Sequence, residues 1–312
     1  MKQLVILSGK GGTGKTSVAA AFAHLAYEGP FPMRAVLADA DVDAANLELV
    51  LNPRKLAAHE FIGGSVAVID PQLCQNCGTC EVVCRFDAII PSSSSTVSQH
   101  STSMKGSTGY AVDPIACDGC AACMYQCPSQ AIHMEPQLVG YWYRSESRYG
   151  PLFHAELRPA QENSGKLVTM VKQQARLLGL DEDRQVMIVD GPPGIGCPVI
   201  SAASGADLAL IVAEPTAAGI HDIQRALQTV SHFRVPAQVT INKADLYPAG
   251  SAQIEQYCRE AGFPLTGQIP FDTTVTEAMT HGEPTTVYRP ASPAGQALVQ
   301  IWQKVARILN GA

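Results

Sequence analysis

Long hydrophobic runs are missing from this sequence. No apolar stretch approaches the roughly 18 residues of a membrane-spanning helix, and Met1 leads directly into a strand-like stretch rather than a signal peptide. We therefore expect a cytoplasmic protein. A length of 312 residues with 46% apolar residues is enough for a sizeable core, and length alone suggests about two domains.

Blocks of basic residues are missing as well. The formal net charge is −6 and no Lys/Arg block occurs, which argues against a nucleic-acid surface of the usual electrostatic kind, although it leaves room for a small local patch. Cysteine, by contrast, is plentiful, with ten residues. Structural disulfides are rare in cytoplasmic proteins, where clustered cysteines more often bind metal or carry out redox chemistry. The spacing of the cysteines therefore decides their role.

Residues 9–16 (GKGGTGKT) fit the phosphate-binding pattern G-x-x-x-x-G-K-[ST]. In such a loop backbone N–H groups cradle phosphates, the final lysine (Lys15) reaches the β- and γ-phosphates, and the next hydroxyl (Thr16) binds Mg²⁺. An apolar run at residues 4–7 predicts a strand before the loop, and residues 16–27 predict a helix after it, which argues against a glycine-rich turn without a ligand. The predicted nucleotide-binding residues of this loop are Gly11, Gly12, Thr13, Gly14, Lys15, Thr16 and Ser17.

Eight of the ten cysteines fall in two runs of identical spacing, C-x2-C-x2-C-x3-C, at residues 74–84 and 117–127. This is the spacing of bacterial ferredoxins with two [4Fe–4S] clusters, in which the fourth cysteine of each run ligates the other cluster. A pair of four-cysteine zinc sites is the alternative, but these usually use two separated C-x2-C pairs. On the ferredoxin rule one cluster is bound by Cys74, Cys77, Cys80 and Cys127, and the other by Cys117, Cys120, Cys123 and Cys84.

The cysteine-rich segment interrupts an alternation of strands and helices. Strands are predicted at residues 35–38, 65–69, 186–189, 208–213 and 238–241, and helices at 166–178, 220–232 and 251–261. This alternation predicts an α/β fold with a doubly wound, mostly parallel sheet that binds ligands at the carboxyl ends of its strands. We expect a P-loop NTPase domain over residues 1–69 and 136–312, with an inserted α+β, bacterial-ferredoxin-like domain over residues 70–135 that contains a flexible Ser/Thr-rich loop at about 91–109.

Charged or turn residues follow three further predicted strands. Asp41 lies in DADVDAANLEL, Asp190 in VMIVDGPPGIG and Asn242 in VTINKADL. Beside a P-loop, Asp190 is placed to hold the Mg²⁺ shell together with Thr16, and Asp41 to orient an attacking water. A helix N-cap is the alternative role for any one aspartate here, and we favour it for Asp43.

Five stretches, SGKGGTGKT, DADVDAANLEL, DGPPGIG, INKADL and IPFDTTVTEAMTHGEP, together resemble the MinD/Mrp branch of the deviant Walker A ATPases, a SIMIBI-type group, and specifically its members with an inserted ferredoxin domain. The resemblance covers nearly the whole chain. It implies ATP or ADP with Mg²⁺ as ligands, catalysis by Lys15 and by Asp41 in switch I, and magnesium binding by Thr16, Asp41 and Asp190. It also places Asn242, Ile269 and Pro270 around adenine.

The same resemblance implies a role for the first lysine of the loop, Lys10. In this family the corresponding lysine reaches across a nucleotide-bridged dimer toward the phosphates of the partner, as an arginine finger does. We therefore count Lys10 among the catalytic residues and expect a homodimer, or a heterodimer with a paralogue, on ATP binding. A solvated surface lysine is the alternative.

Two cysteines lie outside the runs. Cys258 falls in a predicted helix and is expected to be inert packing. Cys197 follows Asp190 in a placement similar to that of a cluster-ligating cysteine in the nitrogenase iron protein, but LRPAQENSGK, the matching region for a second ligand, holds no cysteine. An extra thiol site at Cys197 and simple packing beneath switch II both stay open.

Three functions fit these patterns. We favour an ATPase that couples nucleotide-driven change to electron transfer or metallocofactor assembly, with a redox or metalloprotein partner docking near the insert. A positioning ATPase of the MinD/ParA kind would require a membrane or DNA surface, whereas the terminal segment ALVQIWQKVARIL is predicted to be a packed helix rather than a membrane anchor. The third is a ferredoxin-type carrier, or an iron–sulfur cluster carrier, in which the P-loop binds nucleotide only as a regulatory ligand.

Overall fold

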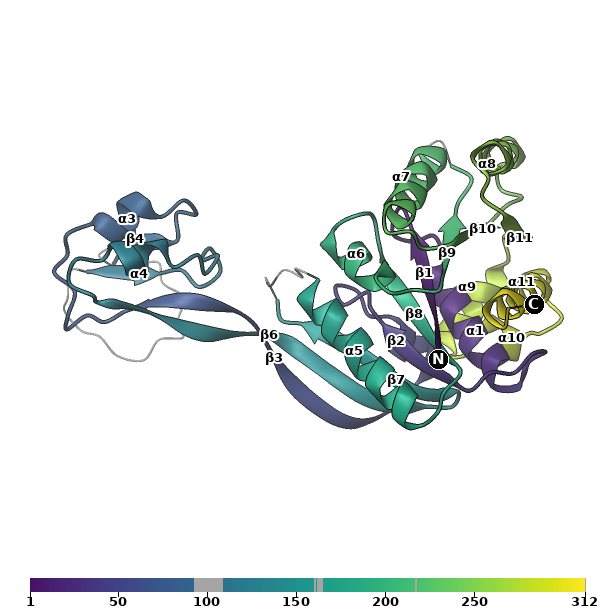
Figure 1. The fold of residues 1–312 in the computed structure, drawn as a ribbon, viewed down its shortest axis with the longest axis horizontal. Helices are drawn as coiled ribbons and strands as arrows, with labels where there is room; N and C mark the ends of the chain where they lie inside the picture. Colours follow the sequence, from purple (N-terminus) through teal and green to yellow (C-terminus); the bar gives the residue numbers. More distant parts are fainter. Residues whose placement is uncertain (93–108, 160, 162–164, 217, 312) are drawn as a thin grey trace. The chain divides into compact units, whose positions relative to one another are not determined.

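The computed structural model describes residues 1–92, 109–159, 161, 165–216 and 218–311. Its internal contacts divide the chain into two compact units (Figure 1). We call them the P-loop unit, which comprises Met1–His59, Tyr141–Leu157 and Asn163–Ala312, and the cysteine unit, which comprises Glu60–Gly140 and Arg158–Glu162.

A nine-stranded sheet forms the centre of the P-loop unit, in the order β11-β10-β9-β1-β8-β2-β7-β6-β3. From β11 to β7 every neighbouring pair is parallel, as predicted. The strands are β1 (Lys2–Ser8), β2 (Ala35–Asp39), β3 (Arg54–Ile69), β6 (Ile132–Ser147), β7 (Gly150–Leu157), β8 (Val186–Pro193), β9 (Leu208–Ala213), β10 (Ala237–Asn242) and β11 (Leu265–Ile269).

Helices cover both faces of this sheet, so the fold is doubly wound. Figure 1 shows α1, α10 and α11 on one face and α5 and α6 on the other. The helices of the unit are α1 (Lys15–Glu28), α2 (Leu47–Leu51), α5 (Lys166–Asp181), α6 (Cys197–Ala203), α7 (Gly219–His232), α8 (Pro248–Ala261), α9 (Thr273–Thr280), α10 (Thr285–Tyr288) and α11 (Pro293–Leu309).

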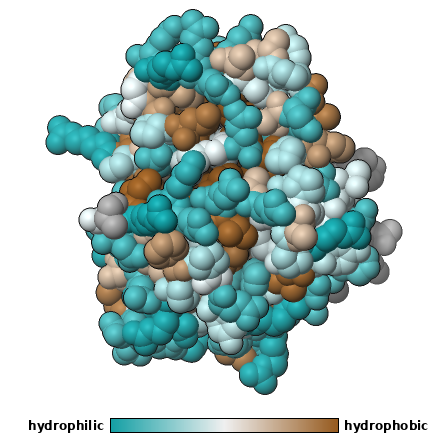
Figure 2. Space-filling model, turned by 90° about the vertical axis from the view of Figure 1, so that its right-hand side faces the viewer, coloured by the Kyte–Doolittle hydropathy of each residue, from teal (hydrophilic) through white to brown (hydrophobic). Residues whose placement is uncertain are grey.

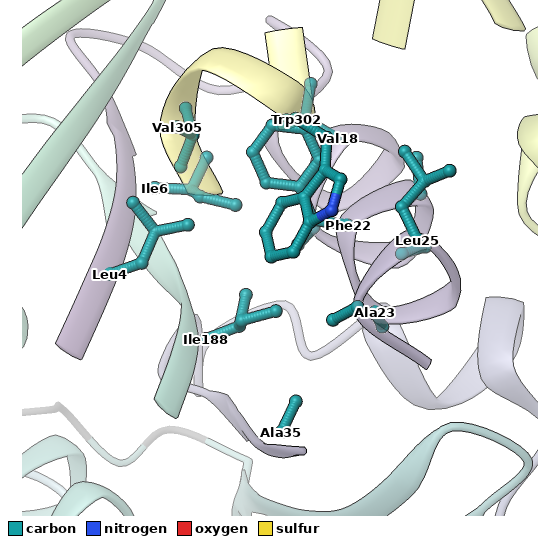
Figure 3. Packing of buried hydrophobic residues seen from close by; sticks show 14 of the residues in the cluster. Leu4, Ile6, Val18, Phe22, Ala23, Leu25, Ala35, Ile188, Trp302 and Val305 are labelled. Atoms are coloured by element: carbon teal, nitrogen blue, oxygen red, sulfur yellow. The ribbon is translucent and has the colours of Figure 1, made fainter. Parts of the chain in front are cut away.

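The core beneath α1 and α11 is packed around two aromatic rings. Phe22 and Trp302 are fully buried with ring centroids 5.1 Å apart, and Leu4, Ile6 and Ile188 of the sheet lie against them (Figure 3). The terminal helix is therefore a packed element, as predicted. Along α11 the buried side chains are Leu298, Ile301, Trp302, Val305 and Leu309.

One large apolar residue of α11 lies outside its packed face. Ile308 is 40% exposed, because it lies beside the buried stripe rather than on it. On the side of the molecule where α11 lies, hydrophobic residues form separate patches among hydrophilic ones (Figure 2).

Within the described part of the chain, no helix is both long and apolar enough to cross a membrane.

Two long strands, β3 and β6, are neighbours at the edge of the sheet and continue into the cysteine unit. At the point where they leave the P-loop unit, the ring of His59 stacks on Trp142 with centroids 4.1 Å apart. The predicted strand at 65–69 is only the end of β3, so the cysteine unit begins earlier than residue 70. The limits 70–135 for a ferredoxin-like domain stay a prediction.

The cysteine unit repeats one local structure. Its helices α3 (Thr79–Val83) and α4 (Ala122–Gln126) each begin after a left-handed residue within a cysteine run, and β4 (Ile89–Pro91) pairs antiparallel with β5 (Tyr110–Val112). Its core contains two cysteine side chains together with apolar ones: Ala67, Cys80, Ile89, Cys123 and Ile132. Most of the expected loop at 91–109 lies outside the described residues, and Pro91 belongs to β4 rather than to that loop.

Candidate nucleotide site and cysteine centre

The loop between β1 and α1 has the geometry of a phosphate cradle. Gly12 and Gly14 have φ angles of 76° and 94°, a region that glycine enters without steric cost. Gly9 is required for a different reason, because a Cβ atom there would lie 2.5 Å from the Cβ of Asp222. The sequence thus places its glycines where the backbone needs them, and α1 begins at Lys15.

Buried polar atoms without a partner gather at this loop. Both carboxylate oxygens of Asp190 and the hydroxyl of Thr13 are buried and make no hydrogen bond within the protein. Burial raises the pKa of Asp190 to about 7, although Thr16 and Lys15 nearby act in the opposite direction. Burying a carboxylate or a hydroxyl without a partner costs free energy unless a ligand provides that partner. A bound cation would pair with the carboxylate of Asp190, and a phosphate oxygen would accept from the hydroxyl of Thr13.

A second buried carboxylate, Asp39, lies beside Asp190 on the neighbouring strand. Burial, and after it the charge of Asp190, raises the pKa of Asp39 well above its usual range. Its two oxygens accept hydrogen bonds from the backbone N–H groups of Asp41 (3.1 Å) and Leu47 (3.0 Å). Asp39 therefore fixes both the loop that carries Asp41 and the start of α2.

Asp41 itself lies at the edge of the site, and burial raises its pKa to about 6 while Lys15 opposes the shift. A carboxylate in this environment is ionised at neutral pH and able to accept a hydrogen bond from water. The N-cap role favoured for Asp43 is wrong. Asn46 precedes α2 instead, and Asp43 is exposed.

The predicted base site lies at the ends of β10 and β11. Ile269 is buried and its carbonyl accepts the N–H of Ala244 (3.0 Å), while Pro270 follows it on the loop. The amide of Asn242 donates to the carbonyl of Thr13 at 2.7 Å, so this side chain holds the phosphate loop. Contact between adenine and these residues stays a prediction.

Lys10 is not free in the structure. Its ammonium lies 2.9 Å from a carboxylate oxygen of Glu214 and 3.1 Å from the hydroxyl of Thr216. The other carboxylate oxygen of Glu214 binds Lys243 at 2.8 Å. Lys10 is thus paired within this chain, and its role across a dimer and the alternative of a solvated surface lysine both stay predictions. Glu214 follows β9, so the rule that found Asp190 at a strand end could have found it too.

One cavity of the cysteine unit brings cysteines of both runs together. This small cavity is lined by Cys74, Cys77, Cys80 and Cys127, together with apolar side chains that include Ile69 and Ile132. The fourth cysteine of this set comes from the other run. These four thiols are the predicted ligands of one cluster.

The second group is less closely defined. Burial raises the pKa of Cys123, which belongs to the small core, and Cys117 packs against this core. Cys84 packs against the same small core. Among the residues that the structure describes, no group of three or more His, Cys, Asp or Glu side chains is arranged so that it could hold a metal ion. Cluster binding therefore stays a prediction.

The two remaining cysteines differ in environment. Cys258 is buried and its pKa is raised to about 11 by burial, which fits the inert packing role predicted for it. Cys197 is exposed at the first residue of α6, so it does not pack beneath switch II. An extra thiol site at Cys197 remains untested.

Comparison with known proteins agrees with this geometry. The sequence profile described as "CobQ/CobB/MinD/ParA nucleotide binding domain" matches residues 4–285. The chain belongs to this family. An uncharacterized protein of Methanocaldococcus jannaschii is 31% identical over 277 residues, which is 88% of this chain and 86% of that protein.

Other relatives resemble shorter parts of the chain. An iron-sulfur cluster carrier protein of Pyrococcus furiosus is 27% identical over 162 residues, 47% of this chain and 53% of its own length. One of Aquifex aeolicus is 24% identical over 136 residues, 40% of this chain and 37% of its own length.

Solved structures of the family share the fold. The MinC:MinD complex of Aquifex aeolicus matches with a TM-score of 0.57 at 18% identity, over 98% of this chain and 96% of that one. MinD of Pyrococcus horikoshii with Mg-ADP matches with a TM-score of 0.55 at 18% identity, over the same shares. At such identity the likeness establishes the MinD-like fold alone.

Proposed function

We propose that the chain is a Mg-ATP-binding and hydrolysing, dimeric ATPase that carries two [4Fe–4S] clusters and couples nucleotide-driven conformational change to electron transfer or to the assembly of metallocofactors. One observation carries this proposal. A P-loop with a buried, unpartnered Asp190 and a cavity lined by four cysteines of two different runs occur in the same chain.

In the nucleotide half, each residue has a distinct task. The ammonium of Lys15 contacts the β- and γ-phosphates, and Asp41 orients the attacking water. Mg²⁺ bound by Thr16, Asp41 and Asp190 supplies positive charge against the phosphate oxygens. Lys10 completes the site of a second copy of the chain, and to do so it must exchange Glu214 for the phosphates of that copy.

In the cysteine half, two groups of four thiolates hold the clusters, which supply one-electron redox capacity. The cavity that Cys74, Cys77, Cys80 and Cys127 share supports the crossed ligand set for one of them. Nucleotide-driven change in hydrogen bonding or solvent access around such a centre would shift its reduction potential. A redox protein or an immature metalloprotein is the partner class that this chemistry requires.

The deciding experiment is an anaerobic redox titration of the reconstituted protein, followed by EPR, without nucleotide and then with Mg-ATP. Iron and sulfide analysis should first give two [4Fe–4S] clusters per chain, and ATP turnover should be measured on the same sample. A nucleotide-dependent shift of potential or of the EPR signal is the expected result. An unchanged titration despite confirmed ATP binding would remove redox coupling from the proposal.

A second candidate function, cluster delivery, is favoured by the relatives named iron-sulfur cluster carrier proteins. A carrier needs labile clusters, whereas complete crossed coordination favours stable ones. Mixing the loaded protein with an apo-ferredoxin and a chelator trap separates the two functions. Rapid transfer to the apo-ferredoxin would favour delivery, and retention of the clusters would favour electron transfer.

A further inference from the structure

A charged side chain on α2 connects three strands. The carboxylate of Glu48 lies 3.4 Å from the ammonium of Lys55 on β3 and 3.3 Å from Nδ1 of His154 on β7. Nε2 of the same imidazole lies 2.9 Å from the hydroxyl of Ser145 on β6. Glu48 therefore contacts β3 and β7 directly and β6 through His154.

The protons in this network can be assigned from chemistry. Burial lowers the pKa of His154 to about 4, so the imidazole is neutral at neutral pH, with one donor and one acceptor nitrogen. A carboxylate can only accept, so we place the imidazole proton on Nδ1, which faces Glu48, and Nε2 then accepts from the hydroxyl of Ser145. The ring of Tyr143 stacks on His154 at 5.1 Å between centroids, and the ammonium of Lys55 lies 4.1 Å from the same tyrosine ring.

Serine, histidine and glutamate are also the residue types of a nucleophilic triad. That role does not fit here. Ser145 has no exposed surface and His154 is only 1% exposed, so a substrate cannot reach the hydroxyl. The network is internal, and its effect must be on the position of the elements that it joins.

Two of the joined strands lead to the cysteine unit, and the helix leads to the nucleotide site. β3 and β6 both run on from the P-loop unit into the cysteine unit. α2 follows directly on the loop that holds Asp41, and Asp39 fixes both of these, because its carboxylate accepts hydrogen bonds from the backbone N–H groups of Asp41 and Leu47. A displacement of this loop therefore displaces Glu48.

We propose that Glu48 is a positioning residue that transmits the state of the Asp41 loop to β3 and β6. The proposal rests on the function proposed above and deepens it by naming the connection between the two halves. When α2 moves, the carboxylate must either carry Lys55 and His154 along or leave the ammonium and the buried imidazole without the negative charge that faces them, which costs free energy. A shift of β3 and β6 between two arrangements in this way is the requirement for transmitting a signal.

Hydrogen–deuterium exchange on the full chain, with and without Mg-ATPγS, tests the proposal. In the parent protein the nucleotide should change exchange in the P-loop, in residues 40–52, and in peptides of β3 and β6. In Glu48→Gln, which keeps the shape and loses the charge, the change in β3 and β6 should shrink about fivefold while the P-loop response stays. Glu60→Gln, an exposed carboxylate on β3, is the matched control and should behave like the parent.

A second variant covers the case in which Glu48→Gln is unstable. Lys55→Gln alters the same contact from a side chain that is 48% exposed and should also weaken the response of β3. Unchanged responses in both variants, or a parent protein whose β3 and β6 do not respond to nucleotide, overturn the proposal. ATP turnover measured on the same samples is a separate result. If the parent protein does not turn over ATP, the proposed ATPase function is contradicted, whatever the exchange data show.

Discussion

The P-loop unit and the cysteine unit differ in where their candidate functional side chains lie relative to the hydrophobic core. In the first, Asp39, Asp190 and Lys15 lie at the end of a large apolar core that packs without them. In the second, Cys80 and Cys123 are themselves part of a core of five buried residues. A core so small gives little stability by apolar burial alone. If the cysteine unit binds clusters as proposed, we expect the P-loop unit to fold before it binds its ligand and the cysteine unit to depend on its ligand to fold.

The largest expected effect comes from removing iron. An anaerobically loaded protein treated with a chelator, or a Cys80→Ser variant, should lose the fold of the cysteine unit. In a small domain held together by metal, the free energy of metal binding is a large part of the free energy of folding. Exchange protection in β4 and β5 should vanish, while ATP affinity of the P-loop unit stays within about twofold.

Cys197→Ser is the control for this experiment, because Cys197 lies outside the cysteine unit and should leave iron content unchanged. Retention of protected β4 and β5 amides after complete iron removal would contradict the dependence of this unit on its clusters.

The next effect concerns catalysis in the other unit. Asp41→Ala should lower the ATP turnover number by about 10²–10⁴-fold, because the attacking water loses its acceptor, and it should leave iron content and the EPR signal unchanged. Phosphate release assays measure the first effect. Asp43→Ala, an exposed carboxylate on the same loop, should retain turnover close to that of the parent. Equal losses of turnover in both variants would mean that turnover depends on the structure of the loop rather than on the carboxylate of Asp41.

A smaller effect is expected on the pH dependence of stability. The pKa of His154 falls from 6.5 to about 4 on folding, so between these values the unfolded chain binds the proton more tightly. The free energy of unfolding should therefore drop as pH falls from 6.5 to 4, by on the order of 3 kcal/mol for this group.

Urea unfolding followed by tryptophan fluorescence isolates this effect. Trp142 and Trp302, the two tryptophans of the chain, both belong to the P-loop unit, so the signal reports on that unit alone. His154→Gln should flatten the pH slope. His59→Gln, which replaces an exposed histidine, should keep it. Identical slopes in the parent and in His154→Gln would show that another group titrates.

The smallest effect is expected on α11. Ile308→Ser should change the free energy of unfolding by less than about 0.5 kcal/mol, because this side chain is 40% exposed, whereas Phe22→Ala should cost about 3–5 kcal/mol. The same urea experiment measures both. A large loss in Ile308→Ser would mean that the exposed side of α11 has a partner in solution.

Local patterns predicted much of the fold and of the site. The P-loop, the strand before Asp190 and the repeated cysteine runs each lie within a few residues of sequence, so spacing alone reveals them. The strands β6 and β7 were not predicted, because apolar and polar residues do not alternate regularly along them and because β6 contains Pro136. Asp43 was misread as an N-cap because the carboxylate that binds the start of α2 comes from Asp39 on the preceding strand.

Contacts between distant parts of the chain could not be predicted. Glu214 binds Lys10 although 203 residues lie between them, and Glu48 meets His154 only because α2 packs beside β7. Such pairs have no periodicity to reveal them. The end of a parallel strand was the one available signal, and it applies to Glu214 but not to Glu48, which lies on a helix.

The stacking of His59 on Trp142 has a consequence for how such a chain can be built. Because β3 and β6 are adjacent where they leave the P-loop unit, the main segment of the cysteine unit, Glu60–Gly140, is inserted at what would otherwise be a simple strand-to-strand turn. A short turn that joins residues 59 and 141 would restore an uninterrupted nucleotide-binding domain. The segment of the cysteine unit between these strands is thus a module that natural variation or design can add, remove or replace without changing the order of the strands in the sheet.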